Sequence, residues 1–81
     1  MEIKKETIKE RIKEAKDYGL TYAQLARELN IQPVTIYMFM SGNSNLSKIN
    51  TLKILCYIEK YIEQVKEQIR IIEQKGVAIN G

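Results

Sequence analysis

The sequence contains no histidine and a single cysteine, Cys56. Zinc is held in proteins by several Cys and His ligands, and a nucleophilic Ser or Cys commonly depends on a His that acts as its base. The chain therefore offers neither a zinc site nor a His-assisted nucleophile, and we expect no enzyme activity, metal or cofactor. One cysteine also excludes a disulfide within the chain, which favours a reduced, cytoplasmic setting.

Long apolar runs and a large charge excess are absent too. No segment is long enough to cross a membrane, and the first ten residues, MEIKKETIKE, lack the apolar stretch of a signal peptide. The formal charge is only +3, which leans toward a polyanionic partner but is common in proteins that bind none. At 81 residues, 44% hydrophobic and 28% charged, the composition predicts one small globular domain of a size often stabilised by a partner subunit.

The first predicted helix runs from about residue 3 to residue 18. It places Ile8, Ile12 and Ala15 at steps of four and three, on one face, and Gly19 ends it. The rest of its surface alternates Glu and Lys. We interpret this surface as a solvated mixed-charge exterior rather than a dedicated phosphate-binding face.

The second predicted helix begins at Thr21, which is followed three residues later by Gln24. This is a capping-box pattern, in which side chains satisfy the free backbone N–H groups at a helix start. Leu25, Ala26 and Leu29 form the buried face of a helix of about nine residues. Asn30 ends it, because Asn tolerates the left-handed conformation needed to turn the chain.

A third predicted helix extends from Pro33 to Ser41, with proline at the favoured first position. Ile31 is expected to be a buried plug before it, and Ile36, Phe39 and Met40 its buried face. No charged residue occurs between residues 30 and 42. The following segment, Ser-Gly-Asn-Ser-Asn, is a loop by composition.

The last predicted helix has no Gly or Pro from residue 46 to residue 75, and Ser47 or Asn50 is expected to cap its start. At about 25 residues it would be near 40 Å long, which exceeds the length of the domain core. The tail after residue 76 is expected to fray. Six apolar residues recur at heptad spacing and predict a dimerisation seam: Leu55, Ile58, Ile62, Val65, Ile69 and Ile72.

Two packings of this seam are open. It can pair with the seam of a second copy, the interpretation we favour, or fold back on the first helix. The flanking positions give no set of ion pairs for a parallel zipper, so the direction of pairing is not resolved; they are Glu59, Tyr61, Lys66, Gln68, Glu73 and Lys75. Cys56 beside the seam is interpreted as a small, buried or half-buried apolar residue rather than a redox group.

Two short helices joined by a tight turn predict a helix-turn-helix unit in an all-α domain of about four helices. At this point the chain resembles the lambda repressor/Cro-like, or XRE-type, helix-turn-helix family, through LTYAQLARELNIQPVTIYMFMSG and NLSKINTLKIL, over roughly residues 8–56. The matching features are a small residue where the helices cross, two buried aliphatic residues, a large apolar residue and a closing glycine; they are Ala26, Ile31, Ile36, Phe39 and Gly42. Asn30 and Gln32 depart from the family's usual Gly and Ser or Thr.

The resemblance implies a DNA-reading role for the third helix. Its base-facing positions correspond to Gln32, Pro33, Val34, Tyr37, Met38 and Ser41. Only Gln32 can make a bidentate contact to a base, so the face is unusually apolar. Phosphate contacts would then come from outside it, from Arg27, Asn43, Asn45, Lys48 and Lys53.

The expected organisation is a DNA-binding domain over residues 1–56 and an extended last helix over 57–81 that dimerises. We expect a small repressor-like regulator from a phage or mobile element, a homodimer that places its recognition helices in successive major grooves of double-stranded DNA about 34 Å apart. The alternative is a protein-binding module on the same frame, such as a phage-encoded inhibitor of a host defence protein (anti-CRISPR-like). Its apolar third helix or its seam would grip another protein.

Overall fold

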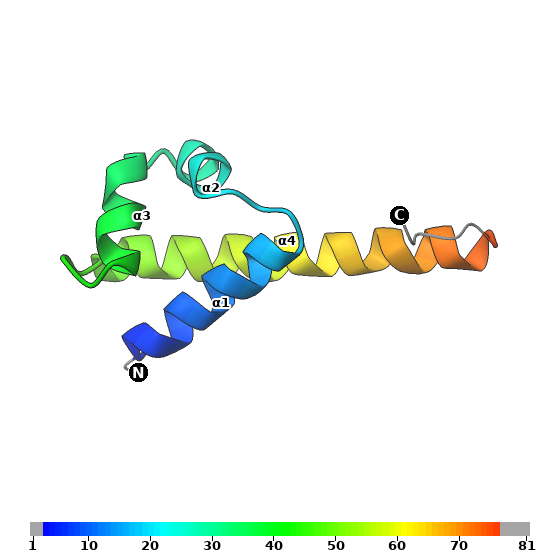
Figure 1. The fold of residues 1–81 in the computed structure, drawn as a ribbon, viewed down its shortest axis with the longest axis horizontal. Helices are drawn as coiled ribbons and strands as arrows, with labels where there is room; N and C mark the ends of the chain where they lie inside the picture. Colours follow the sequence, from blue (N-terminus) through cyan, green and yellow to red (C-terminus); the bar gives the residue numbers. More distant parts are fainter. Residues whose placement is uncertain (1–2, 77–81) are drawn as a thin grey trace.

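The computed structural model (Figure 1) describes residues 3–76 and has, within them, four helices and no strand. Helix α1 spans Lys5–Asp17, α2 spans Tyr22–Leu29, α3 spans Pro33–Met40 and α4 spans Lys48–Gln74. The predicted all-α fold with a long last helix is confirmed. Residues 77–81, in the tail expected to fray, lie outside the described part of the chain.

The helix starts follow the capping residues seen in the sequence. The Thr21 hydroxyl accepts a hydrogen bond from the backbone N–H of Gln24 at 3.0 Å, and the Ser47 hydroxyl accepts one from that of Asn50 at 3.1 Å. Such side-chain caps satisfy N–H groups that have no partner inside the helix. Helix α3 starts differently, because Pro33 occupies its first turn and the side chain of Gln32 makes no capping bond.

The first three helices end in left-handed turns at Gly19 (φ 105°), Asn30 (φ 56°) and Gly42 (φ 87°). After α2, the backbone N–H of Ile31 bonds the Ala26 carbonyl at 2.8 Å and that of Asn30 bonds the Arg27 carbonyl at 3.3 Å. This is the Schellman arrangement, which satisfies free carbonyls and reverses the chain. The turn between α2 and α3 is therefore fixed by backbone geometry.

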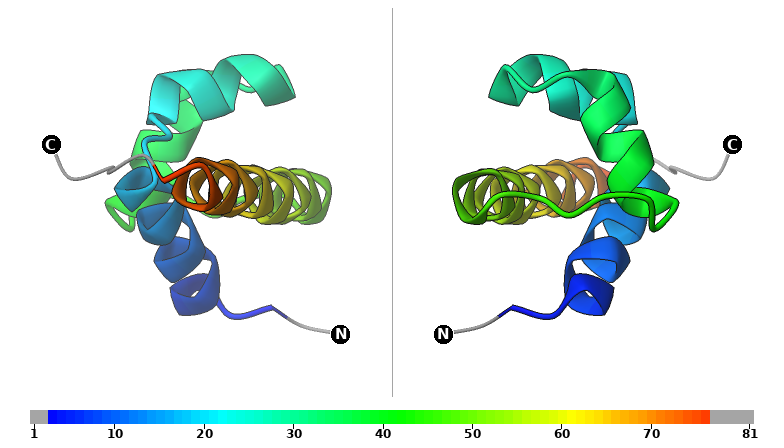
Figure 2. Two further views of the ribbon diagram at one scale, coloured as in Figure 1. Left: turned by 90° about the vertical axis from the view of Figure 1, so that its right-hand side faces the viewer. Right: turned by 90° about the vertical axis from the view of Figure 1, so that its left-hand side faces the viewer.

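The core lies where α1, α2 and α3 meet the first half of α4. Figures 1 and 2 show α2 and α3 on one side of α4 and α1 on the other. Leu29, Ile31 and Met40 pack against this core but are only half-buried, so the prediction that they are buried is wrong. All three lie at or next to a helix end, where fewer neighbours surround a side chain. The buried residues are Ile8, Ile12, Ala15, Leu20, Leu25, Ala26, Ile36, Phe39, Ile54, Ile58 and Ile62.

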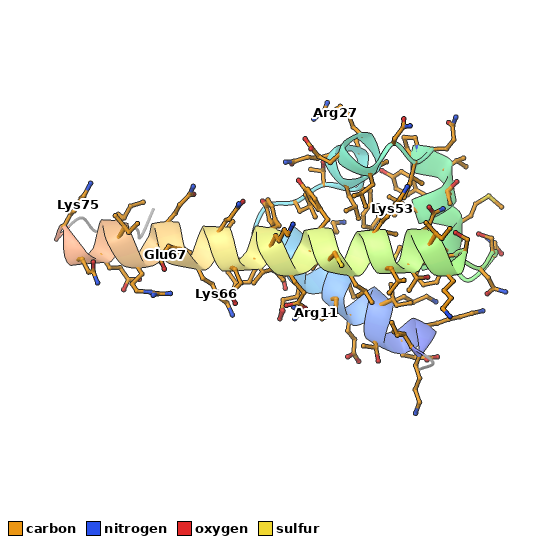
Figure 3. All side chains as sticks on the ribbon, turned by 180° about the vertical axis from the view of Figure 1, so that it is seen from behind. Arg11, Arg27, Lys53, Lys66, Glu67 and Lys75 are labelled. Atoms are coloured by element: carbon orange, nitrogen blue, oxygen red, sulfur yellow. The ribbon has the colours of Figure 1, made fainter. Side chains whose placement is uncertain are left out.

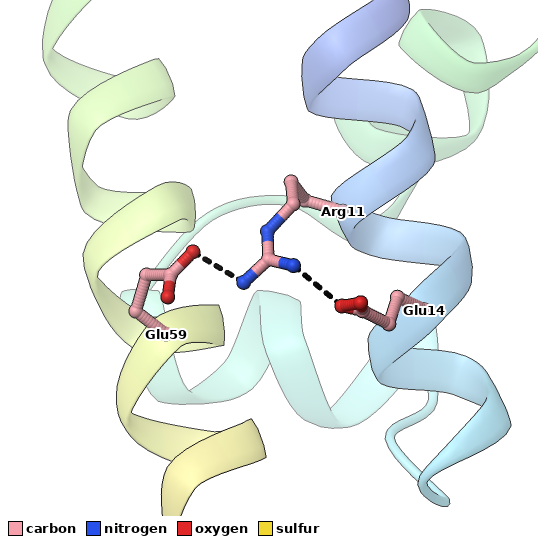
Figure 4. A network of polar contacts seen from close by, with 3 residues as sticks. All are labelled: Arg11, Glu14 and Glu59. Atoms are coloured by element: carbon pink, nitrogen blue, oxygen red, sulfur yellow. Dashed lines mark hydrogen bonds and ion pairs between the residues drawn. The ribbon is translucent and has the colours of Figure 1, made fainter.

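Polar contacts hold α1 to α4. The Arg11 guanidinium pairs with Glu14 on its own helix and with Glu59 on α4 (Figure 4). Near the end of α1, the Tyr61 hydroxyl donates a hydrogen bond to the backbone carbonyl of Tyr18 at 3.2 Å. Because Glu59 and Arg11 are partly exposed, their pair contributes about 0–1 kcal/mol and fixes orientation more than stability.

Helix α4 crosses residue 56, the predicted domain boundary, without interruption. Ile58 and Ile62 beyond that position are buried in the same core as Ile54. The globular part of the chain therefore continues to about residue 62, and only the last part of α4 projects from it in Figure 1. No helix among residues 3–76 has the length and apolar character needed to span a membrane.

Candidate nucleic-acid interface

Helices α2 and α3 form a rigid pair around four buried side chains. Leu25 and Ala26 of α2 and Ile36 and Phe39 of α3 are at most 1% exposed. Figure 2 shows the two helices crossing at a steep angle, joined by the three residues from Asn30 to Gln32. An alanine at the crossing allows the close approach, since a larger side chain would have to displace its neighbours. These contacts fix which face of α3 points outward.

The outward face of α3 carries the six residues that the sequence predicted to face DNA bases. The three large apolar side chains among them are substantially exposed: Val34 at 56%, Tyr37 at 54% and Met38 at 42%. The other three, Gln32, Pro33 and Ser41, are exposed as well. The structure therefore exposes the whole predicted set on α3 and at its two caps, and we call these six residues the α3 face.

Tyr37 on this face is held by a residue that the sequence analysis did not single out. The ring of Tyr22, at the start of α2, meets the Tyr37 ring edge-on with centroids 5.0 Å apart. The Lys16 ammonium lies 4.3 Å from the centroid of the Tyr22 ring. Two rings that meet edge-on attract each other because the positive edge of one faces the negative face of the other. A cation over a ring face is attracted by the same quadrupole. A signal was available, because Tyr22 follows the cap of α2 beside the predicted crossing.

In the turn that ends α3, two of the residues predicted to contact DNA, Ser41 and Asn43, hydrogen-bond within the chain. The Ser41 hydroxyl donates a hydrogen bond to the Met38 carbonyl at 3.0 Å and accepts one from the Asn43 side-chain amide at 3.0 Å. The backbone N–H of Asn43 bonds the same Met38 carbonyl at 2.8 Å. The hydroxyl proton of Ser41 is therefore already used in its hydrogen bond to Met38, whereas the side-chain amide of Asn43 has a second proton that can be donated to a ligand.

The α3 face carries no charged residue, and the basic residues nearest to it in the sequence are Arg27 and Lys48. The chain has no charged residue from residue 29 to residue 47. Between residues 21 and 58 it carries three basic residues and one acidic residue, Glu28, a local charge of +2. The predicted donors are all exposed and come from α2, the loop after α3 and the first half of α4; Figure 3 shows Arg27 on the side of α2 away from α4, with Lys53 on α4. They are Arg27, Asn43, Asn45, Lys48 and Lys53.

Tyr57 of α4 lies close to Gln24, Arg27 and Glu28 of α2. Burial raises the pKa of its phenol above 10.0, and the nearby Glu28 carboxylate and the Tyr61 phenol raise it further. A hydrogen bond from the Gln24 side chain and the charge of Arg27 act in the opposite direction. Tyr57 is therefore neutral at physiological pH and adds no charge to this region.

The predicted seam divides into two parts. Ile58 and Ile62 are at most 2% exposed and Leu55 packs against the same core, so these three side chains serve the monomer rather than a second copy. Val65 and Ile69 are half-buried and Ile72 is 39% exposed. Leu55, Ile58 and Ile62 thus pack within the monomer, as in the alternative in which the seam folds back on the first helix. Val65, Ile69 and Ile72 remain available for a partner. Cys56 is exposed, so the prediction that it is buried or half-buried is wrong, because two helical positions separate it from each of the buried residues Ile54 and Ile58 and place it on the other side of α4.

Among residues 3–76, no group of three or more Cys, Asp or Glu residues is placed to hold a metal ion. No family model, curated protein or solved structure matches the chain. The resemblance to the lambda repressor/Cro-like family therefore depends on the sequence motif alone.

Proposed function

We propose that the protein is a small sequence-specific DNA-binding regulator that acts as a homodimer and reads the major groove with α3. The observation that carries the proposal is the exposure of all six predicted base-facing residues on a helix whose opposite side is locked into the core. A helix presented in this way fits the width of the major groove of B-form DNA.

The chemistry of the α3 face suggests how it would discriminate between bases. The amide of Gln32 makes no capping bond and can both donate to and accept from an adenine edge. Val34 and Met38 can lie against thymine methyl groups. Arg27, Lys48 and Lys53 can contact phosphates, which would position the helix without reading sequence. The proposed site therefore favours A·T base pairs.

Selection of bound duplexes from a random pool tests this proposal. We expect enrichment of a short A·T-rich motif whose affinity falls with salt. Three cations per subunit, six in the homodimer, give a slope of log K against log salt of about −5. A pool that shows no enrichment after repeated rounds would contradict the proposal.

A second candidate function is a protein-binding module, and the composition of the α3 face favours it. Val34, Tyr37 and Met38 are exposed with no charge among them, and Ile49 and Leu52 at the start of α4 are 67% and 48% exposed. Exposed apolar groups in such number are typical of protein interfaces. A titration with nonspecific duplex at low salt separates the two candidates, because a protein-binding module would give no binding there.

A further inference from the structure

The core stripe of α4 continues past the globular part of the molecule. Ile54, Ile58 and Ile62 lie on one face of α4 and are buried by the chain's own helices. Val65, Ile69 and Ile72 extend the same face by further steps of three and four, and none of them packs against the core cluster. We call these three residues the distal seam. Figure 1 shows this half of α4 reaching beyond α1, α2 and α3.

The distal seam begins where α1 stops packing against α4. The Lys66 ammonium lies 5.9 Å from the centroid of the Tyr18 ring, at the end of α1. Before this point, α1 and α2 cover the stripe. A second α4 in parallel orientation would have to follow the stripe toward Ile54 and would meet these helices. An antiparallel partner can overlap the distal seam alone.

The charges beside the distal seam also select the antiparallel direction. Lys66 and Glu73 flank the seam on the same side, one position after Val65 and Ile72. In an antiparallel pair that opposes Ile69 with Ile72 of the partner subunit, Lys66 faces Glu73 of the partner subunit, and symmetry makes this contact twice. A parallel pair would instead put Lys66 beside Tyr61 and Gln68 beside Glu73, without an ion pair.

We propose that two copies of the chain associate tail to tail, through an antiparallel pairing of their distal seams with two Lys66–Glu73 ion pairs. This inference goes beyond DNA reading and does not require it. The overlap covers fewer than two heptads per chain, so we expect a dimer that dissociates on dilution rather than an obligate one.

The pairing has a consequence that rests on the proposed function. With the twofold axis near residue 70 and a rise of 1.5 Å per residue, the N-terminal ends of the two α4 helices would lie about 68 Å apart. Helix α3 lies against that end of α4 in Figure 1. The two recognition helices would then match half-sites separated by about two turns of DNA, instead of the single turn expected from the sequence.

The lone cysteine allows the direction of pairing to be measured in the natural chain. Cys56 is exposed on α4 and is the only thiol, so a nitroxide label attaches at one site. Double electron–electron resonance at high protein concentration and without DNA is expected to give a distance of about 45 Å, as 1.5 Å per residue implies for an antiparallel pair. A distance below about 25 Å, as a parallel pair would give, or the absence of any dimer, would overturn the proposal.

Charge exchange provides a second test that does not depend on the label. Lys66→Glu and Glu73→Lys each turn two attractions into repulsions, and we expect each to weaken dimerisation about tenfold in sedimentation equilibrium. Mixing the two variants should restore association, because the heterodimer regains both ion pairs. Lys60→Glu makes the same charge change away from the seam and should have no effect. If the mixture associates no better than either variant, the proposal is wrong.

Failure of these two tests would leave the proposed DNA reading untouched. Enrichment of a single, unrepeated motif in the duplex selection would then describe a monomeric reader. Conversely, a tail-to-tail dimer that selects no motif would retain the interface and refute the proposed function.

Discussion

The ring of Tyr22 on α2 contacts the ring of Tyr37 on α3 edge-on, with 5.0 Å between centroids. One of these residues lies on the proposed reading surface and the other supports it from the neighbouring helix. Because Tyr37 is 54% exposed, its ring would be free to change rotamer without this support. The contact therefore links the packing of the two helices to the shape of the α3 face.

Replacing Tyr22 with Ala is expected to weaken DNA binding by a few-fold and stability by about 1 kcal/mol, since an aromatic pair contributes about 0.5–1.5 kcal/mol. Base preference should not change, because Tyr22 itself reads no base in our proposal. Fluorescence anisotropy with a selected duplex measures the affinity. Tyr22→Phe keeps the ring and serves as the control. Equal losses in the two variants would point to the hydroxyl rather than the ring contact.

The core and the face of α3 should respond differently to truncation. Ile36 is fully buried, so Ile36→Ala is expected to cost about 2–5 kcal/mol of the free energy of unfolding through lost burial and a new cavity. Val34→Ala on the exposed side should change it by less than about 0.5 kcal/mol. Urea denaturation followed by circular dichroism measures both. Similar costs for the two variants would mean that α3 is oriented otherwise.

Two substitutions should distinguish residues that read bases from residues that bind phosphates. We expect Gln32→Ala to reduce discrimination at one base pair by about 1–3 kcal/mol while leaving the salt dependence intact. Lys48→Gln should weaken binding evenly across sequences and reduce the steepness of the salt slope by about 1 for each subunit, which is about 2 for the homodimer. Affinities for a panel of single-site duplex variants at several salt concentrations provide the comparison. If Gln32→Ala lowered the affinity equally for all duplexes, Gln32 would not be a base-reading residue.

We expect ionisation of the Tyr57 phenol to destabilise the folded chain at alkaline pH. Its pKa is raised in the folded chain, so the unfolded chain releases this proton at a lower pH than the folded one. The contribution of the neutral Tyr57 phenol to stability is therefore fully present below pH 10.0, the pKa of an ordinary tyrosine. It is lost as the pH rises above that value toward the raised pKa of Tyr57 in the folded chain. Tyr57→Phe has no such proton, and its stability should fall less than that of the natural chain between pH 9 and pH 11, about one unit either side of the tyrosine pKa. Identical pH profiles from urea denaturation would contradict this.

Much of the fold is predictable from local sequence rules. Thr21, Asn30 and Pro33 mark helix ends by mechanisms that involve only neighbouring backbone groups, and each adopts its expected conformation. The steps of three and four along α1 and α3 likewise identify Ile12 and Ile36 as core residues, because helical periodicity alone decides which side chains share a face.

What the sequence does not predict depends on contacts between distant segments. The heptad pattern of α4 is continuous, so nothing local reveals that α1 covers Ile58 and Ile62 but stops near Val65. The pairing of Tyr22 with Tyr37, and of Arg11 with Glu59, depends likewise on how the helices cross. Of the candidate site, the sequence identifies the exposed residues of α3 but not the contact that orients Tyr37 or the turn that engages Ser41.

The entry of α3 into a DNA groove can be followed through the backbone amide signals of the isotope-labelled protein during titration with a selected duplex. We expect the largest chemical-shift changes between Gln32 and Ser41, smaller ones at Arg27, Lys48 and Lys53, and none in the distal seam. Unchanged α3 signals, with duplex added well beyond one equivalent, would contradict this expectation.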